Sequence, residues 1–189
     1  MTAHLVYALA WLAFAATHSG LAGGRLKAWA GRWHRIAYNL VALAQFAAVA
    51  GVGAAVLGGE PAFDLPGWLK AAMAAVHLSG WVLMVVAGRW YDLGRLAGTA
   101  QLKGAGDDEP LGTGGIHAWV RHPFYAAGFL ILWGAALSPL GLATAAWGSL
   151  YLLAGTWFEE RRLLGLYGAA YADYRARVPA FIPWRGRVS

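Results

Sequence analysis

The sequence contains no cysteine and few charged residues. Only 13% of its 189 residues are Asp, Glu, Lys or Arg, roughly half of the ~25% that soluble domains carry. The lack of cysteine excludes a disulfide scaffold, a cysteine-ligated metal site and a cysteinyl intermediate. Hydrophobic residues make up 59% of the chain, which excludes intrinsic disorder. A surface so poor in charge aggregates in water, so the composition predicts a protein whose solvent is lipid.

Long runs without charge mark the candidate membrane spans. A spanning helix needs about 20 apolar residues, and three runs, 1–24, 36–59 and 71–88, hold one span each. The fourth run, 122–158, has Ser138-Pro139 in its middle, which predicts a hairpin of two helices because proline ends a helix. We therefore predict a single all-α, integral membrane domain over residues 1–189. Its five predicted spans are 3–22, 37–58, 68–90, 120–137 and 140–160.

The basic residues predict how the chain is oriented. Five spans place fourteen of the fifteen Lys and Arg residues on one side and only Lys70 on the other. Basic loops stay in the cytoplasm, so the N-terminus is predicted outside and the C-terminus inside. Beside the membrane these residues meet anionic headgroups, and the net charge of +6 therefore predicts no nucleic-acid partner. Apolar residues at helical spacing over 160–176 predict a cytoplasmic, amphipathic C-terminal helix.

Polar residues gather where the predicted spans end on the cytoplasmic side. Polar groups inside lipid are costly, so each is a functional candidate. Two adjacent carboxylates at the end of the fifth span oppose the helix dipole and predict a cationic neighbour, either an arginine or a cationic ligand. The alternatives are an interfacial salt-bridge network for the carboxylates and a snorkelling arginine beside a helix-start proline. The residues concerned are His18, Arg121, His122, Pro123, Tyr125, Glu159 and Glu160.

The segment between the third and fourth spans, 103–119, is the candidate cofactor loop. Five glycines between positions 104 and 115 let the backbone approach a ligand closely; the alternative is a flexible surface loop. No strand precedes it and no G-x-G-x-x-G occurs, so a Rossmann dinucleotide site is not supported. His117 and His122 lack the further ligands that a metal site needs, so no metal is predicted.

Three elements of the second half together resemble the isoprenylcysteine carboxyl methyltransferase superfamily. The first is the run 115–125, GIHAWVRHPFY, which contains an R-H-P-x-Y element. The second is the helical hairpin after it. The third is an E-E-x-x-L element at 159–163, with Tyr167-Gly168, Tyr171, Tyr174 and Val178-Pro179 beyond it. The resemblance covers about residues 109–183, and the stretch 151–183 looks most like the bacterial branch that includes methanethiol S-methyltransferases. The N-terminal third, with His18-Ser19 and the run 35–39, is similar to that branch and to NnrU-type membrane proteins.

The resemblance implies an S-adenosylmethionine-dependent methyltransferase in a bacterial inner membrane, with a cofactor pocket open to the cytosol. Carried over by position, the residues implied to line the cofactor are Leu111, Gly112, His117, His122, Pro123, Tyr125, Glu159 and Glu160. Arg121, His122, Glu159 and His18 are the implied or candidate catalytic residues. A carboxylate suits this cofactor because it carries a sulfonium and an ammonium group.

The expected class of methyl acceptor depends on one position where the chain departs from the family pattern. Eukaryotic members of the superfamily carry an arginine for the substrate carboxylate where this chain has Gly155. We therefore expect a small or lipophilic acceptor, a thiol rather than a prenylcysteine carboxylate or a phospholipid amine. A thiol must lose its proton, and His18, His117 and His122 are candidate bases. The alternative function is a non-catalytic accessory membrane protein of NnrU type; the sequence does not determine the oligomeric state.

Overall fold

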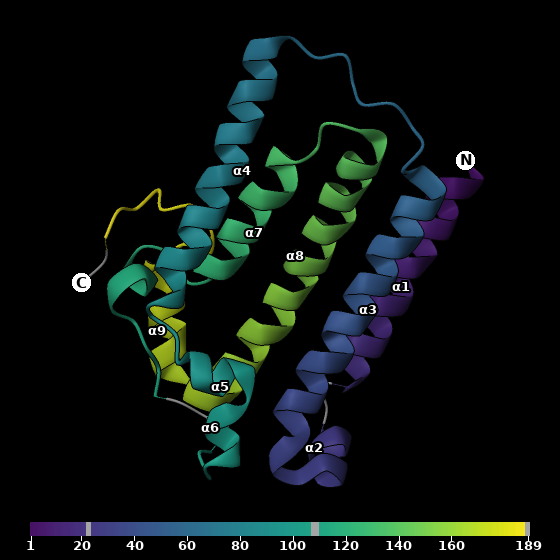
Figure 1. Ribbon diagram of the computed structural model, residues 1–189. Coiled ribbons are helices and arrows are strands. Elements are labelled where there is room, and N and C mark those ends of the chain that lie inside the picture. The colour runs from purple at the N-terminus through teal and green to yellow at the C-terminus, as the bar shows by residue number, and fades with distance from the viewer. Residues whose placement is uncertain (22–23, 107–109, 188–189) are drawn as a thin grey trace.

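The computed structural model describes residues 1–21, 24–106 and 110–187, and every regular element in these ranges is a helix (Figure 1). The all-α prediction is confirmed. The five long helices are α1 (Thr2–Leu21), α3 (His34–Leu57), α4 (Gly67–Gly88), α7 (Pro123–Gly134) and α8 (Pro139–Tyr167). The short elements are α2 (Gly24–Ala30), η1 (Gly31–Trp33), α5 (Leu93–Ala97), α6 (Thr99–Leu102), η2 (Gly115–Ala118) and α9 (Ala169–Arg177).

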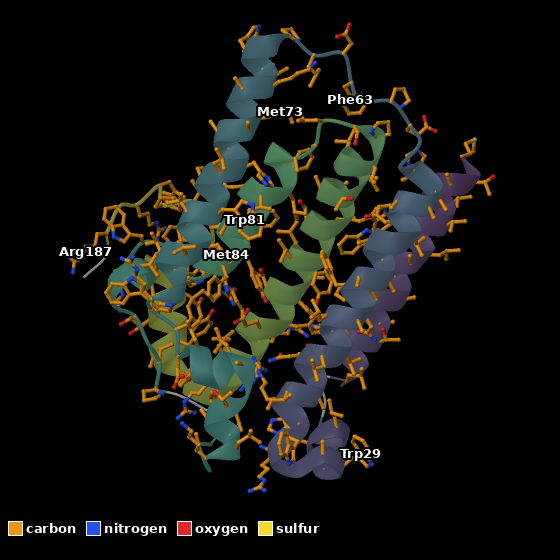
Figure 2. All side chains as sticks on the ribbon, in the orientation of Figure 1. Trp29, Phe63, Met73, Trp81, Met84 and Arg187 are labelled. Carbon is orange, nitrogen blue, oxygen red and sulfur yellow. The ribbon has the colours of Figure 1, made fainter. Side chains whose placement is uncertain are left out.

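Large apolar side chains cover the outer faces of the long helices. Leu9, Leu43 and Val85 each keep more than 60% of their surface exposed, and side chains such as Trp81 and Trp29 are seen projecting from the ribbon in Figure 2. Two stretches, Leu26–Leu57 and Gly67–Gly88, are long and apolar enough to cross a membrane. Such surfaces are stable in lipid and not in water. Membrane crossing by each of the five predicted spans stays a prediction.

Helices α1 and α3 pack side by side against one flank of α8 (Figure 1). Their shared core contains Tyr7, Trp11 and Phe14 of α1, with Val49 and Leu57 of α3. The hydroxyl groups of Tyr7 and Thr144 of α8 hydrogen-bond at 2.8 Å. In lipid, packing and interhelical hydrogen bonds rather than the hydrophobic effect hold helices together, so these contacts fix α1 and α3 beside α8.

Helices α4 and α7 approach each other through two glycines. A Cβ at Gly134 would lie 2.4 Å from the backbone nitrogen of His77, and one at Gly80 would lie 2.8 Å from the nitrogen of Ile131. The close approach allows His77 Nδ1 to donate to the carbonyl oxygen of Ile131 at 2.8 Å. The histidine within the third predicted span is therefore bonded to the neighbouring helix, which satisfies a polar group inside lipid.

The ends of the last helices differ from the predicted limits. Helix α7 begins at Pro123, three residues later than position 120, because the residue before a proline avoids the helical conformation and His122 has φ of −122° and ψ of 67°. The N–H groups of Arg121 and His122 donate to the carbonyl oxygens of Pro179 and Ala180, at 2.9 and 3.0 Å. Helix α8 runs past 160 to Tyr167. A single helix over 160–176 does not form, because Gly168, with φ of 54°, separates α8 from α9. Glycine adopts this backbone conformation without the steric cost other residues meet.

The glycine contact between α4 and α7 predicts a position-specific loss of stability. Gly134→Ala should destabilise the protein by about 1–3 kcal/mol, because the new methyl group overlaps the backbone of His77. Gly51→Ala in α3 is the matched control, since its Cβ would meet nothing within 4 Å. Thermal unfolding in detergent measures both. An equal melting temperature for the two variants would contradict the close packing of α4 and α7.

Candidate functional site

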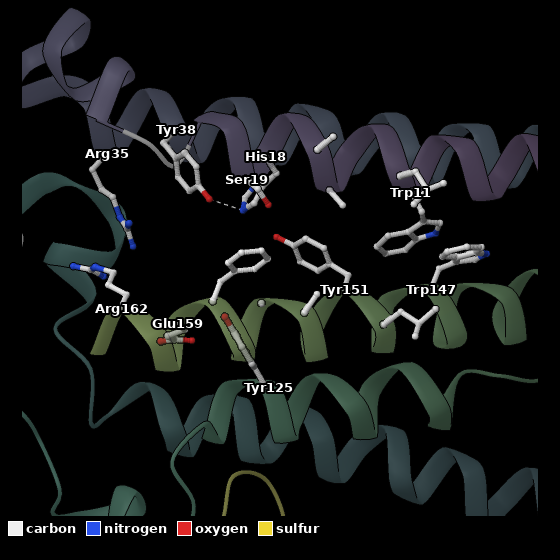
Figure 3. Close-up of a pocket in the computed structure, with 17 residues that line it drawn as sticks. Trp11, His18, Ser19, Arg35, Tyr38, Tyr125, Trp147, Tyr151, Glu159 and Arg162 are labelled. Atoms are coloured by element: carbon white, nitrogen blue, oxygen red, sulfur yellow. Dashed lines mark hydrogen bonds between the residues drawn. The ribbon is translucent and has the colours of Figure 1, made fainter. Parts of the chain in front are cut away.

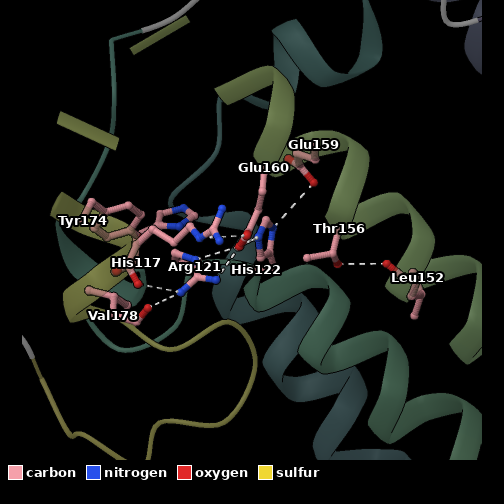
Figure 4. Close-up of polar contacts among 10 residues, drawn as sticks. His117, Arg121, His122, Leu152, Thr156, Glu159, Glu160, Tyr174 and Val178 are labelled. Carbon is pink, nitrogen blue, oxygen red and sulfur yellow. Dashed lines mark hydrogen bonds and ion pairs between the residues drawn. The ribbon is translucent and has the colours of Figure 1, made fainter. Parts of the chain in front are cut away.

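A buried ion pair joins the start of α7 to the end of α8. The Arg121 and Glu160 side chains are only 10% and 13% exposed, and Nε of Arg121 donates to Oε1 of Glu160 at 2.9 Å, with Nη2 donating to the same oxygen (Figure 4). Nη1 donates to the carbonyl oxygens of Arg175 and Val178 at the end of α9. One guanidinium group thus ties together α7, α8 and the segment after α9.

His122 extends this network toward the other glutamate. Its ring is buried, with Nε2 3.1 Å from Oε1 of Glu160 and Nδ1 3.6 Å from Oε2 of Glu159. The ring also stacks on Tyr125, with centroids 5.6 Å apart and planes at 17°. A histidine between two carboxylates is held in place from both sides. His122 therefore links the buried ion pair to Glu159 and Tyr125.

The two adjacent glutamates face different surroundings. Neighbouring residues on a helix point about 100° apart, so Glu160 turns toward Arg121 while Glu159 turns away from it. The Glu159 side chain is 42% exposed and lines a cavity beside α8. The cation that the carboxylate pair predicts is Arg121 for Glu160, whereas Glu159 lies near the His122 ring and borders the cavity.

The cavity, of about 1080 Å³, lies between the α1–α3 pair and α8 (Figure 3). Arg35, Arg162 and Glu159 lie toward one end, and Trp11 and Trp147 toward the other. The middle is lined by polar and small side chains. These are His18, Ser19, Tyr38, Tyr125, Tyr151 and Gly155. Pockets for one drug-sized ligand measure about 300–1,000 Å³, so this cavity lies at the upper end of that range.

The predicted site residues fall into two groups. Three of them, His18, Tyr125 and Glu159, line the cavity. Arg121, His122 and Glu160 form the network behind it, and their contacts with one another favour a positioning role. Pro123 is buried at the first turn of α7, where its missing N–H costs nothing. Leu111 packs on the cluster of Tyr171, Tyr174 and Val178, and Gly112 is exposed.

The predicted cofactor loop is anchored at its second half. A Cβ at Gly115, where φ is 60°, would lie 2.2 Å from the Trp90 ring, so only glycine fits there. The carbonyl oxygen of His117 accepts a 2.7 Å hydrogen bond from the Tyr174 hydroxyl group. Burial lowers the pKa of His117 below its ordinary value, so the ring is neutral at pH 7. Residues 107–109 of this loop lie outside the described residues.

Sequence reasoning missed two tyrosines that line the cavity, Tyr38 on α3 and Tyr151 on α8. The signal was helical periodicity: Tyr151, Gly155 and Glu159 are spaced i, i+4, i+8 and so share one face of α8. In α1, Trp11, Ala15 and Ser19 repeat the same spacing. Two such faces with a polar residue at one end mark the cavity walls.

Comparison with known proteins finds similarity to curated methanethiol S-methyltransferases. The chain is similar to methanethiol S-methyltransferase 1 of Bradyrhizobium diazoefficiens, with 32% identity over 126 residues, 64% of this chain and 44% of the relative. It is 33% identical to the methanethiol S-methyltransferase of Crocosphaera subtropica over 78 residues, 41% of this chain and 31% of the relative. The Mycobacterium tuberculosis protein of that name is 30% identical over 124 residues, 62% of this chain and 51% of the relative.

These similarities confirm the resemblance drawn from the sequence elements. The chain spans about half the length, or less, of the curated relatives it matches. No family model matches the chain. No solved structure matches it significantly.

The buried ion pair predicts unequal effects of two changes around Glu160. Arg121→Gln should destabilise the protein by about 3–5 kcal/mol, because it leaves a buried carboxylate unpaired. Arg175→Gln removes a cation that is 48% exposed and 3.5 Å from the same glutamate, and should cost about 1 kcal/mol or less. Thermal unfolding of both variants in one detergent measures the difference. Equal losses would contradict a structural role for the Arg121–Glu160 pair.

Proposed function

We propose that the protein is an integral-membrane methyltransferase that uses S-adenosylmethionine and methylates a small or lipophilic thiol. The observation that carries the proposal is the position of Glu159: a partly exposed carboxylate on the wall of a cavity of about 1080 Å³. The names of the relatives support methyl transfer to a thiol. A purely accessory protein has no use for a carboxylate held beside such a cavity.

The residues of the cavity wall suit the proposed cofactor. Glu159 offers a negative charge to the ammonium or sulfonium group, and Arg35 and Arg162 at the same end offer positive charge to a carboxylate. Tyr125, Tyr151 and Phe158 supply aromatic faces. The cofactor, when bound, supplies an electrophilic methyl group. The resemblance adds Leu111, Gly112 and His117 as further cofactor contacts, which remain predictions.

The protein's own contribution would be positioning and the exclusion of water. Methyl transfer is an in-line displacement, so the acceptor atom must be held close to the methyl carbon. The Arg121–Glu160–His122 network fixes the end of α8 and thereby the direction of Glu159. The apolar end of the cavity, between Trp11 and Trp147, keeps water away from the acceptor.

We further propose that the five predicted spans cross the bacterial inner membrane, with the N-terminus outside. Helix α7 has 12 residues, fewer than the ~20 that a crossing needs, so the fourth crossing would include the segments on either side of α7. The polar end of the cavity, with Arg35 and Arg162, then opens to the cytosol, where the cofactor is made. The acceptor would reach the cavity from the cytosol or from the bilayer. Exposed apolar side chains on the outer helix faces support the membrane placement.

Cofactor binding tests the proposal directly. Purified protein in detergent or nanodiscs should bind S-adenosylmethionine in a calorimetric titration, and Glu159→Gln should weaken binding about tenfold or more, because a charge-assisted contact of about 1.5–3 kcal/mol is lost. Asp173→Asn, an exposed acid on α9, is the control and should bind like the wild type. No binding by the wild type would overturn the methyltransferase proposal and favour an accessory role of NnrU type.

The absence of cysteine makes the topology testable with single substitutions. Gly59→Cys, in the loop between α3 and α4, should react in intact cells with a thiol reagent that does not cross membranes. Ala172→Cys, exposed on α9, should react only after the cells are broken. The wild-type protein, which has no cysteine, is the negative control. Labelling of Ala172→Cys in intact cells would contradict the cytoplasmic C-terminus.

A further inference from the structure

The three candidate bases occupy different places. His122 has each ring nitrogen near a glutamate carboxylate, and the His117 ring packs edge-on against Tyr91 outside the cavity lining. His18, on α1, is the only one of the three that lines the cavity. It lies on the wall opposite Glu159 (Figure 3). An acceptor between the two walls would therefore have His18 on one side and the proposed cofactor contact on the other.

His18 is paired with a tyrosine of the neighbouring helix. The hydroxyl oxygen of Tyr38 on α3 is 2.5 Å from Nε2 of His18, and both side chains line the cavity. The His18 ring is also held by Phe14 and Tyr151, with ring centroids 5.2 and 5.8 Å away. The pair is rigid and hydrogen-bonded in the way that a proton acceptor and its donor must be.

The other ring nitrogen cannot serve the acceptor directly. Nδ1 of His18 is buried and has no hydrogen-bond partner among the described residues. A proton that moves between the cavity and His18 must therefore pass through Nε2, and Nε2 is occupied by the Tyr38 hydroxyl group. Tyr38 is consequently the group through which His18 communicates with a molecule in the cavity.

We propose that Tyr38 and His18 form a proton relay that ionises the acceptor thiol, an inference that rests on the proposed methyltransferase function. The S–H proton of the acceptor passes to the Tyr38 oxygen while the Tyr38 phenolic proton passes to His18 Nε2. The thiolate sulfur then forms the bond to the methyl carbon. The electron pair of the broken carbon–sulfur bond stays with the donor sulfur, which becomes a neutral thioether.

The relay keeps the charge of the buried site constant. Before the reaction the positive charge lies on the sulfonium group, and afterwards it lies on the His18 imidazolium, which later releases its proton to solvent. No step adds net charge to a site of low polarity, where a new charge is costly. The Arg35 guanidinium, 5.9 Å from the centre of the Tyr38 ring, favours transient negative charge on the tyrosine oxygen.

Other titratable and charged groups line the same cavity, and a pH profile must distinguish their titration from that of the His18–Tyr38 pair. They are Arg35 on α3, Tyr125 on α7, and Tyr151, Glu159 and Arg162 on α8. None of them is hydrogen-bonded to His18 in the described structure. The cysteine thiol, with an ordinary pKa of about 8.5, is mostly protonated at pH 7, and a simple alkanethiol is a weaker acid still and needs a base. An acidic arenethiol, in contrast, ionises in solution.

The test is a comparison of two acceptors across three variants. Tyr38→Phe and His18→Gln should lower kcat/KM for an alkanethiol about a hundredfold at pH 7, with the loss shrinking as rising pH ionises the thiol. For an arenethiol that is already ionised, the loss should be a few-fold at most. Tyr7→Phe, which removes an interhelical hydroxyl group of α1 outside the cavity lining, should leave both rates near wild type. S-adenosylmethionine affinity, measured by calorimetry, should be unchanged in all three.

The outcomes separate the relay from the function on which it rests. Equal losses on both acceptors, or a loss of cofactor affinity in Tyr38→Phe, would show that the pair merely holds α1 against α3. Wild-type kcat/KM values for the alkanethiol in both Tyr38→Phe and His18→Gln would also overturn the relay while leaving methyl transfer intact. Absence of methyl transfer by the wild-type protein to either thiol overturns the proposed function and the relay with it.

Discussion

The contact between Arg121 and Glu160 determines most of what surrounds the candidate site. Removing two charges from water is expensive, and the cost is recovered only when the geometry is good and the remaining donors are satisfied. Arg121 meets both conditions, because its other nitrogen donates to carbonyl oxygens at the end of α9. Three parts of the chain that are distant in sequence are therefore fixed at one point. The same contact fixes the direction of Glu159, which precedes Glu160 on α8 and lines the cavity.

The residues of the two sequence elements have different surroundings in the structure: some bind one another, and others line the cavity. The R-H-P-x-Y and E-E-x-x-L elements contain residues for support and residues for contact with a ligand. Arg121, His122 and Glu160 bind one another, whereas Tyr125 and Glu159 face the cavity. The opposite wall comes from α1 and α3, which the motifs do not include. Under the proposed function, substrate choice would thus depend on the N-terminal helices, while the support of the carboxylate stays in the C-terminal half.

The sequence allowed prediction of the helical class, the candidate polar residues and the pairing of a glutamate with a cation. These follow from composition, from charge-free runs and from the helix dipole, all of which are local properties. The sequence did not reveal which glutamate is paired, because that depends on the rotation of α8 about its axis. It also did not reveal Tyr38, because tyrosine at the end of a span has an ordinary explanation as an interfacial residue. The start of α7 at Pro123 and the end of α8 at Gly168 coincide with local signals, a proline and a glycine, that charge-free and apolar runs alone do not show. The contacts of Arg121 and His122 with Pro179 and Ala180 join residues far apart in the sequence, which no local pattern encodes.

The backbone bonds from Arg121 and His122 to the carbonyl groups of Pro179 and Ala180 have a consequence for how the protein is made. During synthesis α7 and α8 are complete well before residue 180 leaves the ribosome. Until then the N–H groups of Arg121 and His122, just before α7, lack their acceptors, and the Arg121 side chain lacks the carbonyl groups at the end of α9. The support behind Glu159 is therefore assembled last, after all the long helices have been synthesised. A nascent chain can be threaded and paired in the membrane without yet having a site that binds ligand.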